Sequence, residues 1–175
     1  MKKTTALLSI LFCLFFPVLL SAQLPCSLPG FRQFDFWIGE WDVYSNANGK
    51  LAGTSKISLI LDSCIILEEW TSAGAFKGLV YSGKSFNKYN PGTRQWQQTW
   101  VDNTGNSTEF LRGVAEKDKV TFYADHVLDN KGNEYMRRLT FFKLADNKVR
   151  QFGEKSTDGG KTWITEYDLE YRRKT

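Results

Sequence analysis

Most of the chain alternates between runs rich in β-branched and aromatic residues and short clusters of asparagine, aspartate, glycine or lysine. Clusters of this composition supply the positive φ angles of tight hairpin turns. They divide the chain into about ten strands. No long run of helical periodicity appears that could connect parallel strands, so we expect an antiparallel meander. The turn clusters lie at residues 46–50, 90–94, 102–106, 116–119, 129–133, 145–148 and 157–161.

A meander of about ten strands in one domain either stacks as two sheets or closes on itself. Closure removes the unpaired strand edges that otherwise invite aggregation. We therefore expect an all-β fold, a closed antiparallel meander barrel of about ten strands with a short N-terminal helical turn. A β-sandwich with an aromatic-rich first strand is the alternative.

The segment FDFWIGEW at residues 34–41 places four large aromatic residues beside acids and a glycine. We interpret it as a short turn that leads into the first strand. A Gly-x-Trp sequence at this point resembles the start of lipocalin-like barrels, in which the tryptophan closes one end and packs against a basic residue of the last strand. The resemblance implies structural roles for Gly39 and Trp41, with Arg172 or Arg173 as the basic partner.

The chain also resembles a family of bacterial secreted proteins whose domains carry F-D-F-W-x-G-x-W-D-V near the start. The segments CIILEEWTS, GKSFNKYNPGTRQWQQTWVDN, KVRQF and STDGGKTW occur in the same order as in that family. The resemblance implies a calycin-like fold, and the family's biochemical function is uncharacterised. Gly153 stands where relatives often carry a large aromatic residue, which implies extra room inside this barrel.

Residues 1–22 have the features of a cleaved secretory signal. Two lysines precede an apolar run at residues 6–20 that ends in LSAQ, and we expect cleavage after Ala22. The run is shorter than the roughly 20 residues of a membrane helix, so no permanent membrane anchor is expected. Residues 23–175 then form a single domain that is secreted or periplasmic.

The charge and cysteine content limit the classes of partner and cofactor that we expect for this domain. Without the two lysines of the signal, 21 basic residues stand against 19 acidic residues, and no long run of like charge occurs. Nucleic acid is therefore not an expected partner, and we expect a monomer. Cys26 and Cys64 are the cysteines outside the signal, and an oxidising compartment favours a disulfide between them over two free thiols. No cofactor and no metal site are predicted, although a haem held by the lone His126 is an alternative.

Candidate binding residues follow from the alternation of side chains along a strand. The tryptophans of QWQQTWVD are expected to point inward, and Lys84 and Lys88 outward. The same rule places the 68–70 face and the 149–151 face inside, and an outward Lys143 places Arg138 inside. The predicted ligand-binding set is Glu68, Trp70, Ser85, Asn87, Gln98, Trp100, Arg138 and Gln151.

This interior is too polar for a fatty chain, because unpaired buried polar groups cost roughly 1 to 3 kcal/mol each. We therefore expect a small polar or aromatic ligand, with Trp70, Trp96 and Trp100 lining or bordering its pocket. A closed internal network around a Glu68–Arg138 ion pair is the structural alternative, and a protein-interaction module would use the outer surface instead. An isomerase or lyase with Glu68 as general base is the enzymatic alternative, and no other catalytic residue is assigned.

The segment STDGGKTW also satisfies the S-x-D-x-G-x-T-W box of sialidase propellers. The box occurs once, whereas a propeller needs several repeated blades. We interpret it as a self-contained turn in which Asp158 accepts hydrogen bonds from its own loop.

Overall fold

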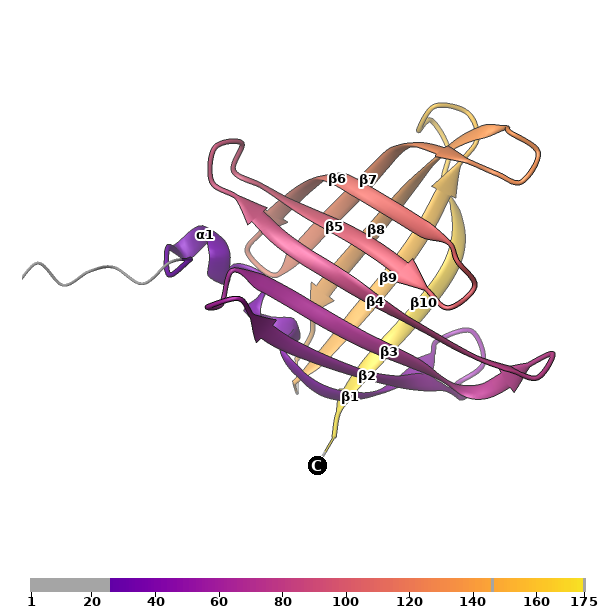
Figure 1. The fold of residues 1–175 in the computed structure, drawn as a ribbon, viewed down its shortest axis with the longest axis horizontal. Coiled ribbons are helices and arrows are strands. Elements are labelled where there is room, and N and C mark those ends of the chain that lie inside the picture. The colour runs from indigo at the N-terminus through magenta and orange to yellow at the C-terminus, as the bar shows by residue number, and fades with distance from the viewer. Residues whose placement is uncertain (1–25, 146, 175) are drawn as a thin grey trace, which may run out of the picture.

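The computed structural model describes residues 26–145 and 147–174, so the predicted signal at residues 1–22 lies outside the described residues. Ten antiparallel strands form one closed barrel in which β1 also pairs with β10 (Figure 1). The predicted all-β meander barrel with a short N-terminal helical turn is confirmed. None of the helices in the described part of the chain is long and apolar enough to cross a membrane.

The elements follow one another without crossovers. They are α1 (Pro29–Arg32), the 3-10 helix η1 (Asp35–Trp37), β1 (Gly39–Ser45), β2 (Leu51–Ile60), β3 (Ile65–Phe76), β4 (Leu79–Asn90), β5 (Gln95–Asp102), β6 (Ser107–Glu116), β7 (Lys119–Leu128), β8 (Glu134–Lys143), β9 (Lys148–Ser156) and β10 (Ile164–Arg173). All seven predicted turn clusters lie at strand connections. Two connections were missed, at residues 61–64 and 77–78, where Leu61, Asp62, Ser63 and Lys77 adopt positive φ without being glycine.

The segment FDFW closes one end of the barrel, which we call the closed end. α1 lies beside this end (Figure 1). The Phe34 ring centroid lies 4.9 Å from Phe141, 5.0 Å from Trp37 and 5.7 Å from Trp96. Phe34, Trp37 and Phe141 are fully buried, and Phe122 completes the cluster. Ring-on-ring packing of this kind excludes water and stabilises the closed end.

A disulfide and an arginine attach the N-terminal segment to the barrel. Cys26 and Cys64 are joined, which confirms the predicted disulfide. The bridge attaches the N-terminal segment to the turn between β2 and β3. The Arg32 guanidinium donates a hydrogen bond to the Ser63 carbonyl oxygen at 2.5 Å in the same turn. Asp35 pairs with Arg32 at 3.4 Å. The helical segment is therefore held in place covalently as well as by packing.

The Gly-x-Trp unit pairs with the last strand, as the lipocalin-like resemblance implied. The Trp41 indole is fully buried and donates a hydrogen bond to the Trp37 carbonyl oxygen at 2.9 Å. The Arg173 guanidinium lies 4.5 Å from the Trp41 ring, and a Cβ on Gly39 would overlap that guanidinium. Arg172, the other predicted partner, instead lies 4.1 Å from the Tyr44 ring. The basic partner of Trp41 is Arg173, because strand alternation turns neighbouring residues to opposite faces.

Candidate functional site

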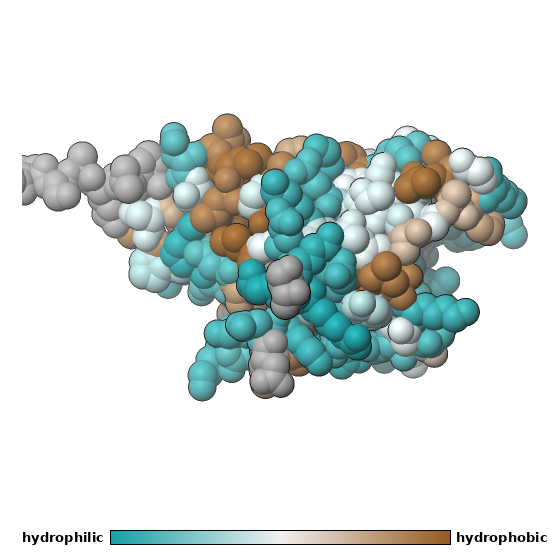
Figure 2. All heavy atoms as spheres, turned by 90° about the horizontal axis from the view of Figure 1, so that it is seen from below, coloured by the Kyte–Doolittle hydropathy of each residue, from teal (hydrophilic) through white to brown (hydrophobic). Residues whose placement is uncertain are grey.

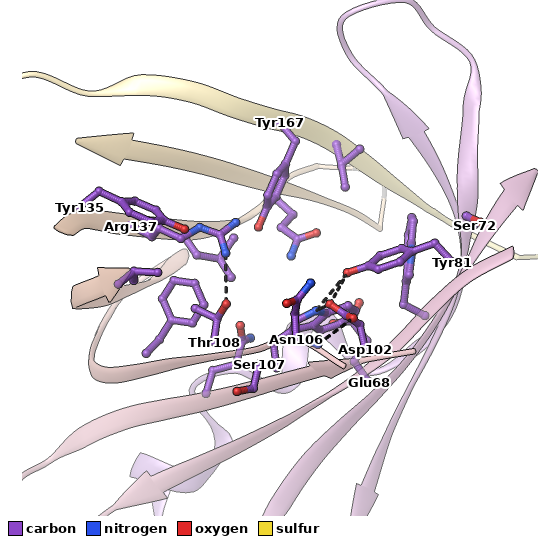
Figure 3. A pocket seen from close by; sticks show the side chains of 18 of the residues that line it. Glu68, Ser72, Tyr81, Asp102, Asn106, Ser107, Thr108, Tyr135, Arg137 and Tyr167 are labelled. Carbon is purple, nitrogen blue, oxygen red and sulfur yellow. Dashed lines mark hydrogen bonds between the residues drawn. The ribbon is translucent and has the colours of Figure 1, made fainter. Parts of the chain in front are cut away.

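A cavity of about 650 Å³ occupies the half of the lumen away from the aromatic cluster. Figure 3 shows the side chains that line it. Its lining runs from the buried Glu68 to the exposed turn residues Asn106 and Asn130. These turns join β5 to β6 and β7 to β8, so the cavity reaches the end of the barrel opposite α1. We call this region the open half. Its volume falls in the roughly 300–1,000 Å³ range of small-molecule sites.

Glu68 on β3 lies at the bottom of the cavity and is 2% exposed. The Ser55 hydroxyl on β2 donates to Oε1 at 2.9 Å, and the Ser85 hydroxyl on β4 donates to Oε2 at 3.1 Å. The Tyr171 hydroxyl on β10 lies 3.1 Å from Oε1. The partners come from three strands because all these residues point into the lumen. Glu68 forms no ion pair with any described residue.

Two amides continue this network along the adjacent strands β4 and β5. The Gln98 Nε2 group donates to Asn87 Oδ1 at 2.7 Å. Asn87 Nδ2 donates to the Ser85 hydroxyl at 2.9 Å and to the Ile66 carbonyl oxygen at 3.0 Å. Each buried amide is thus hydrogen-bonded, which removes the cost of burying it. The network has a fixed geometry at the bottom of the cavity.

The hydrogen bonds of the Tyr171 hydroxyl indicate the protonation state of Glu68. The Tyr171 hydroxyl lies 2.7 Å from Gln151 Oε1 as well as 3.1 Å from Glu68 Oε1, and it has one proton to donate. A protonated Glu68 satisfies both contacts, because Glu68 then donates to Tyr171 and Tyr171 donates to Gln151. Burial raises the pKa of Glu68 to about 7, against the opposing effect of its three hydroxyl partners. The carboxyl group therefore titrates near neutral pH.

Aromatic rings form the walls of the cavity, and glycines on neighbouring strands make room for them. A Cβ on Gly83 would overlap the Trp100 indole, and a Cβ on Gly53 would approach the Trp70 indole too closely. A Cβ on Gly153 would overlap the Tyr167 ring. Glycine in a strand often marks such a close approach. These rings pack against backbone rather than against other rings across the lumen, which leaves the cavity unfilled.

Arg137 on β8 is the cationic side chain of the lining. Its Nε donates to Glu166 at 2.7 Å. Its Nη1 donates to the Thr108 hydroxyl at 3.3 Å (Figure 3). Glu166 lies at a register shift of β10 between Thr165 and Tyr167, a bulge that redirects side chains. Both members of the ion pair are about one-fifth exposed, at 20% and 21%. The positive charge of Arg137 is therefore already matched.

The opposite wall carries an acid, Asp102, that forms no ion pair with another residue described in the structure. Asp102 Oδ2 accepts a hydrogen bond from the Tyr81 hydroxyl at 3.1 Å and one from the Trp100 indole at 3.4 Å (Figure 3). Burial acts to raise the pKa of Asp102, but hydrogen bonds from Thr104 and Tyr81 outweigh it and lower the pKa. Asp102 therefore carries a negative charge at neutral pH.

Strand alternation placed seven of the eight predicted binding residues in the lumen. Five of them line the cavity: Glu68, Trp70, Gln98, Trp100 and Gln151. Ser85 and Asn87 are fully buried and lie in the network behind the lining. Whether these residues bind a ligand stays a prediction.

The inward orientation predicted for Arg138 is wrong. Arg138 forms a two-pronged ion pair with Glu154 at 2.8 and 2.9 Å and lies 4.3 Å from the Trp163 ring, outside the cavity lining. The ion pair between Arg138 and Glu68, which belonged to the structural alternative, does not form. The error arose because the exposed Lys143 was taken to mark the outer face, whereas its exposure reflects its position at the last residue of β8.

Several residues of the site were not predicted. Tyr81, Tyr167 and Tyr171 follow the same alternation and were within reach of it. Arg137 was missed because its neighbour Arg138 was predicted to point into the lumen instead. The bulge residue Glu166 lies outside any simple alternation.

Three further expectations concerned Trp96, the space beside Gly153, and His126. The first two were wrong. Trp96 is 2% exposed in the aromatic cluster and does not line the cavity. The extra room expected beside Gly153 is filled by Tyr167. His126 is exposed and pairs with Glu134 outside the cavity, and no group of three or more His, Cys, Asp or Glu residues in the described ranges is arranged to hold a metal ion.

The Asp158 box forms the predicted self-contained turn. Asp158 Oδ1 accepts hydrogen bonds from the Ser156 hydroxyl at 2.7 Å and from the Thr162 backbone nitrogen at 2.9 Å. None of the box residues lines the cavity.

A scan against protein-family models found no match to the chain, and a search of curated proteins found none either. The function must therefore be argued from the cavity itself.

Proposed function

We propose that the protein binds a small polar or aromatic molecule inside the open half of the barrel. The observation that carries this proposal is the unfilled cavity of about 650 Å³, in which flat aromatic walls surround hydrogen-bonding groups. Sites of this kind combine apolar surface with a few positioned polar groups. The wholly buried network beneath the cavity gives that surface a rigid base.

Features of the lining support a polar ligand rather than a fatty chain. Glu68, Gln98 and Gln151 are polar groups at the bottom of the cavity, and Arg137 and Asp102 are charged groups on its walls. A hydrocarbon ligand would displace water from the donor and acceptor positions of these groups that no protein partner fills, at a cost of roughly 1 to 3 kcal/mol for each position left unpaired. A ligand with its own donors and acceptors avoids that cost.

The outer surface supports a protein-interaction role less well. On the face drawn in Figure 2, hydrophobic side chains lie in separate groups between hydrophilic ones. The most exposed large hydrophobic residues among those described belong to different turns and strands, and include Leu61, Phe76, Leu128 and Ile164. Interaction surfaces are contiguous apolar patches.

A fragment screen by ligand-observed NMR tests the proposal, with a variant that fills the cavity. Ser72 on β3 lines the cavity, so Ser72→Trp places an indole inside it. Thr71→Trp is the matched control, because Thr71 is the exposed neighbour on the other face. We expect aromatic fragments to bind the wild type and Thr71→Trp but not Ser72→Trp. Equal binding to all three proteins, or to none, contradicts binding in the lumen.

Acid–base catalysis is a second candidate, favoured by one observation. The carboxyl group of Glu68 has a pKa raised to about 7 by burial and lies beside the Tyr171 hydroxyl. A general base works best when its pKa is near the working pH. Chemical conversion of a bound fragment, lost in Glu68→Gln, would be the evidence for an isomerase or lyase.

We further propose that the protein is secreted or periplasmic and belongs to the secreted bacterial family whose motif it carries. The disulfide between Cys26 and Cys64 is compatible with an oxidising compartment. A closed barrel of ten strands is compatible with the calycin-like fold implied for the family. N-terminal sequencing of the exported protein tests the predicted cleavage after Ala22.

A further inference from the structure

Building on the proposed function, we infer that the cavity selects an organic cation, an amine attached to a flat or aromatic group. The nitrogen would meet the Glu68 carboxylate at the bottom of the cavity, and the flat group would lie between the aromatic walls. The inference rests on the charges, the free acceptor capacity and the rings of the lining.

The charges of the lining favour a positive ligand. Glu68, Asp102 and Asp129 are the acids of the lining, and Arg137 is its cation. Arg137 is paired with Glu166, whereas neither Glu68 nor Asp102 forms an ion pair within the described residues. A ligand cation would supply the missing positive charge at the buried acid, where an ion pair is screened least.

Glu68 retains capacity for another donor. An ionised carboxylate offers about four acceptor positions. Three hydroxyl groups approach it, those of Ser55, Ser85 and Tyr171. Tyr171 can turn its proton to Gln151 instead, at 2.7 Å. An ammonium group can therefore donate to Glu68 without displacing the network.

The walls suit a cation carried on a flat group. Trp70, Trp100, Tyr81 and Tyr167 line the cavity, and the Tyr81 and Trp100 ring centroids lie 6.3 Å apart. Faces of tryptophan and tyrosine attract cations and stack with other rings. An anionic ligand would find its cation, Arg137, already engaged by Glu166 and Thr108.

The surroundings of Glu68 give the inference a pH signature. Glu68 contacts the hydroxyl groups of Ser55 on β2, Ser85 on β4 and Tyr171 on β10. Gln151 on β9 contacts Tyr171, and Tyr167 on β10 is a second tyrosine whose charge would interact with Glu68. Burial raises the pKa of Tyr167, so Tyr167 stays neutral. Tyr171 stays neutral because burial raises its pKa well above the ordinary value. Binding of a cation should therefore weaken as Glu68 takes up a proton below about pH 7.

Three matched probes test the inference: 2-phenylethylamine, the neutral 2-phenylethanol and the anionic phenylacetate. Binding is followed through intrinsic tryptophan fluorescence. At pH 8 we expect the amine to bind wild type at least about tenfold more tightly than the alcohol or the acid. We expect its affinity, and not that of the alcohol, to fall about tenfold per pH unit below the pKa of Glu68.

Glu68→Gln should remove both the preference for the amine and its pH dependence. Glu69→Gln is the matched control, because Glu69 is the neighbouring residue on the outer face and pairs with Lys84. Wild type at low pH gives the same test without a substitution, should Glu68→Gln fail to fold. A preference that survives in Glu68→Gln and disappears in Asp102→Asn overturns the assignment to Glu68.

The outcomes separate this inference from the proposed function. If the alcohol or phenylacetate binds as tightly as the amine and Ser72→Trp blocks that binding, the inference is wrong and lumen binding stands. If none of the three probes binds, the inference is again wrong. The fragment screen then decides independently whether the lumen binds anything.

Discussion

The closed end and the open half of the lumen use the same kinds of residue in different ways. At the closed end, Phe34, Trp37 and Phe141 pack ring against ring and are fully buried. In the open half, Trp70 and Trp100 are partly buried and lie over glycines of the adjacent strands. Whether an aromatic residue fills the lumen or lines a cavity is therefore decided by the residue that faces it.

Polar residues follow the same division. The open half carries the Glu68 network and the Arg137–Glu166 pair, while the core at the closed end is composed of aromatic and aliphatic side chains. The closed end stabilises the fold. The open half has acceptor positions and negative charges, on Glu68 and Asp102, that a ligand could pair with. Substitutions at the closed end should therefore mainly lower stability, whereas substitutions in the open half should mainly change binding and pH dependence.

The largest expected effect is at the closed end. Trp41→Ala should lower the free energy of unfolding by about 3 to 5 kcal/mol, because removal of a fully buried indole leaves a large cavity. Trp100→Ala, at the cavity wall, should cost less than about half as much, because its ring is already partly exposed. Urea unfolding measures both. Equal losses would remove the distinction between the two regions.

The disulfide should have the next largest effect. Cys26→Ser should lower the free energy of unfolding by about 3 to 4 kcal/mol, since the bridge spans 38 residues and restricts the unfolded chain. Reduction of the wild type should produce the same loss. Thiol labelling of the denatured, unreduced protein should find neither cysteine free, and labelling of both would contradict the bridge.

Glu68 should give the open half a distinct pH dependence. The folded protein holds the Glu68 proton up to about pH 7, whereas the unfolded chain releases it near 4.5. This stabilisation is complete below the unfolded pKa and is lost as the pH rises through the folded pKa, by about 3 kcal/mol in total. Glu68→Gln lacks this loss. Unfolding curves of both proteins from about pH 4 to pH 8 measure the difference, and parallel curves would show that Glu68 is not buried as described.

Substitution of a glycine beneath one of the rings should have the smallest effect on stability. Gly153→Ala should lower the free energy of unfolding by about 1 to 3 kcal/mol, because its Cβ would overlap the Tyr167 ring. Gly74→Ala is the matched control, since a Cβ there meets no atom within 4 Å. Thermal unfolding distinguishes them. A neutral Gly153→Ala would mean that Tyr167 is free to move away from the wall.

The fold and much of the site could be predicted because strand alternation is strict in uninterrupted strands. The faces that hold Glu68, Asn87 and Gln98 were inferred from tryptophans and lysines within the same strands, and the structure places all three inside. The turns at residues 61–64 and 77–78 were missed although Asp62, Ser63 and Gly78 are residue types common in turns, because each turn includes a residue, Leu61 or Lys77, that seldom adopts positive φ.

Other features depend on the register between strands and could not be predicted from neighbouring residues in the sequence. The error at Arg138 came from relying on Lys143 at a strand end, where exposure does not report the face. The Arg137–Glu166 pair depends on a bulge in β10. The size of the cavity depends on which glycine faces which ring, as Gly83 on β4 faces Trp100 on the adjacent strand β5.

The most direct test of a ligand site in the open half is native mass spectrometry of the protein purified without denaturation from its own source. We expect the wild type and Thr71→Trp to carry a noncovalent small molecule, and Ser72→Trp, whose indole fills the cavity, to carry none. The same bound mass on all three proteins would place the ligand outside the lumen. A wild type that carries no small molecule and binds no fragment would contradict the account.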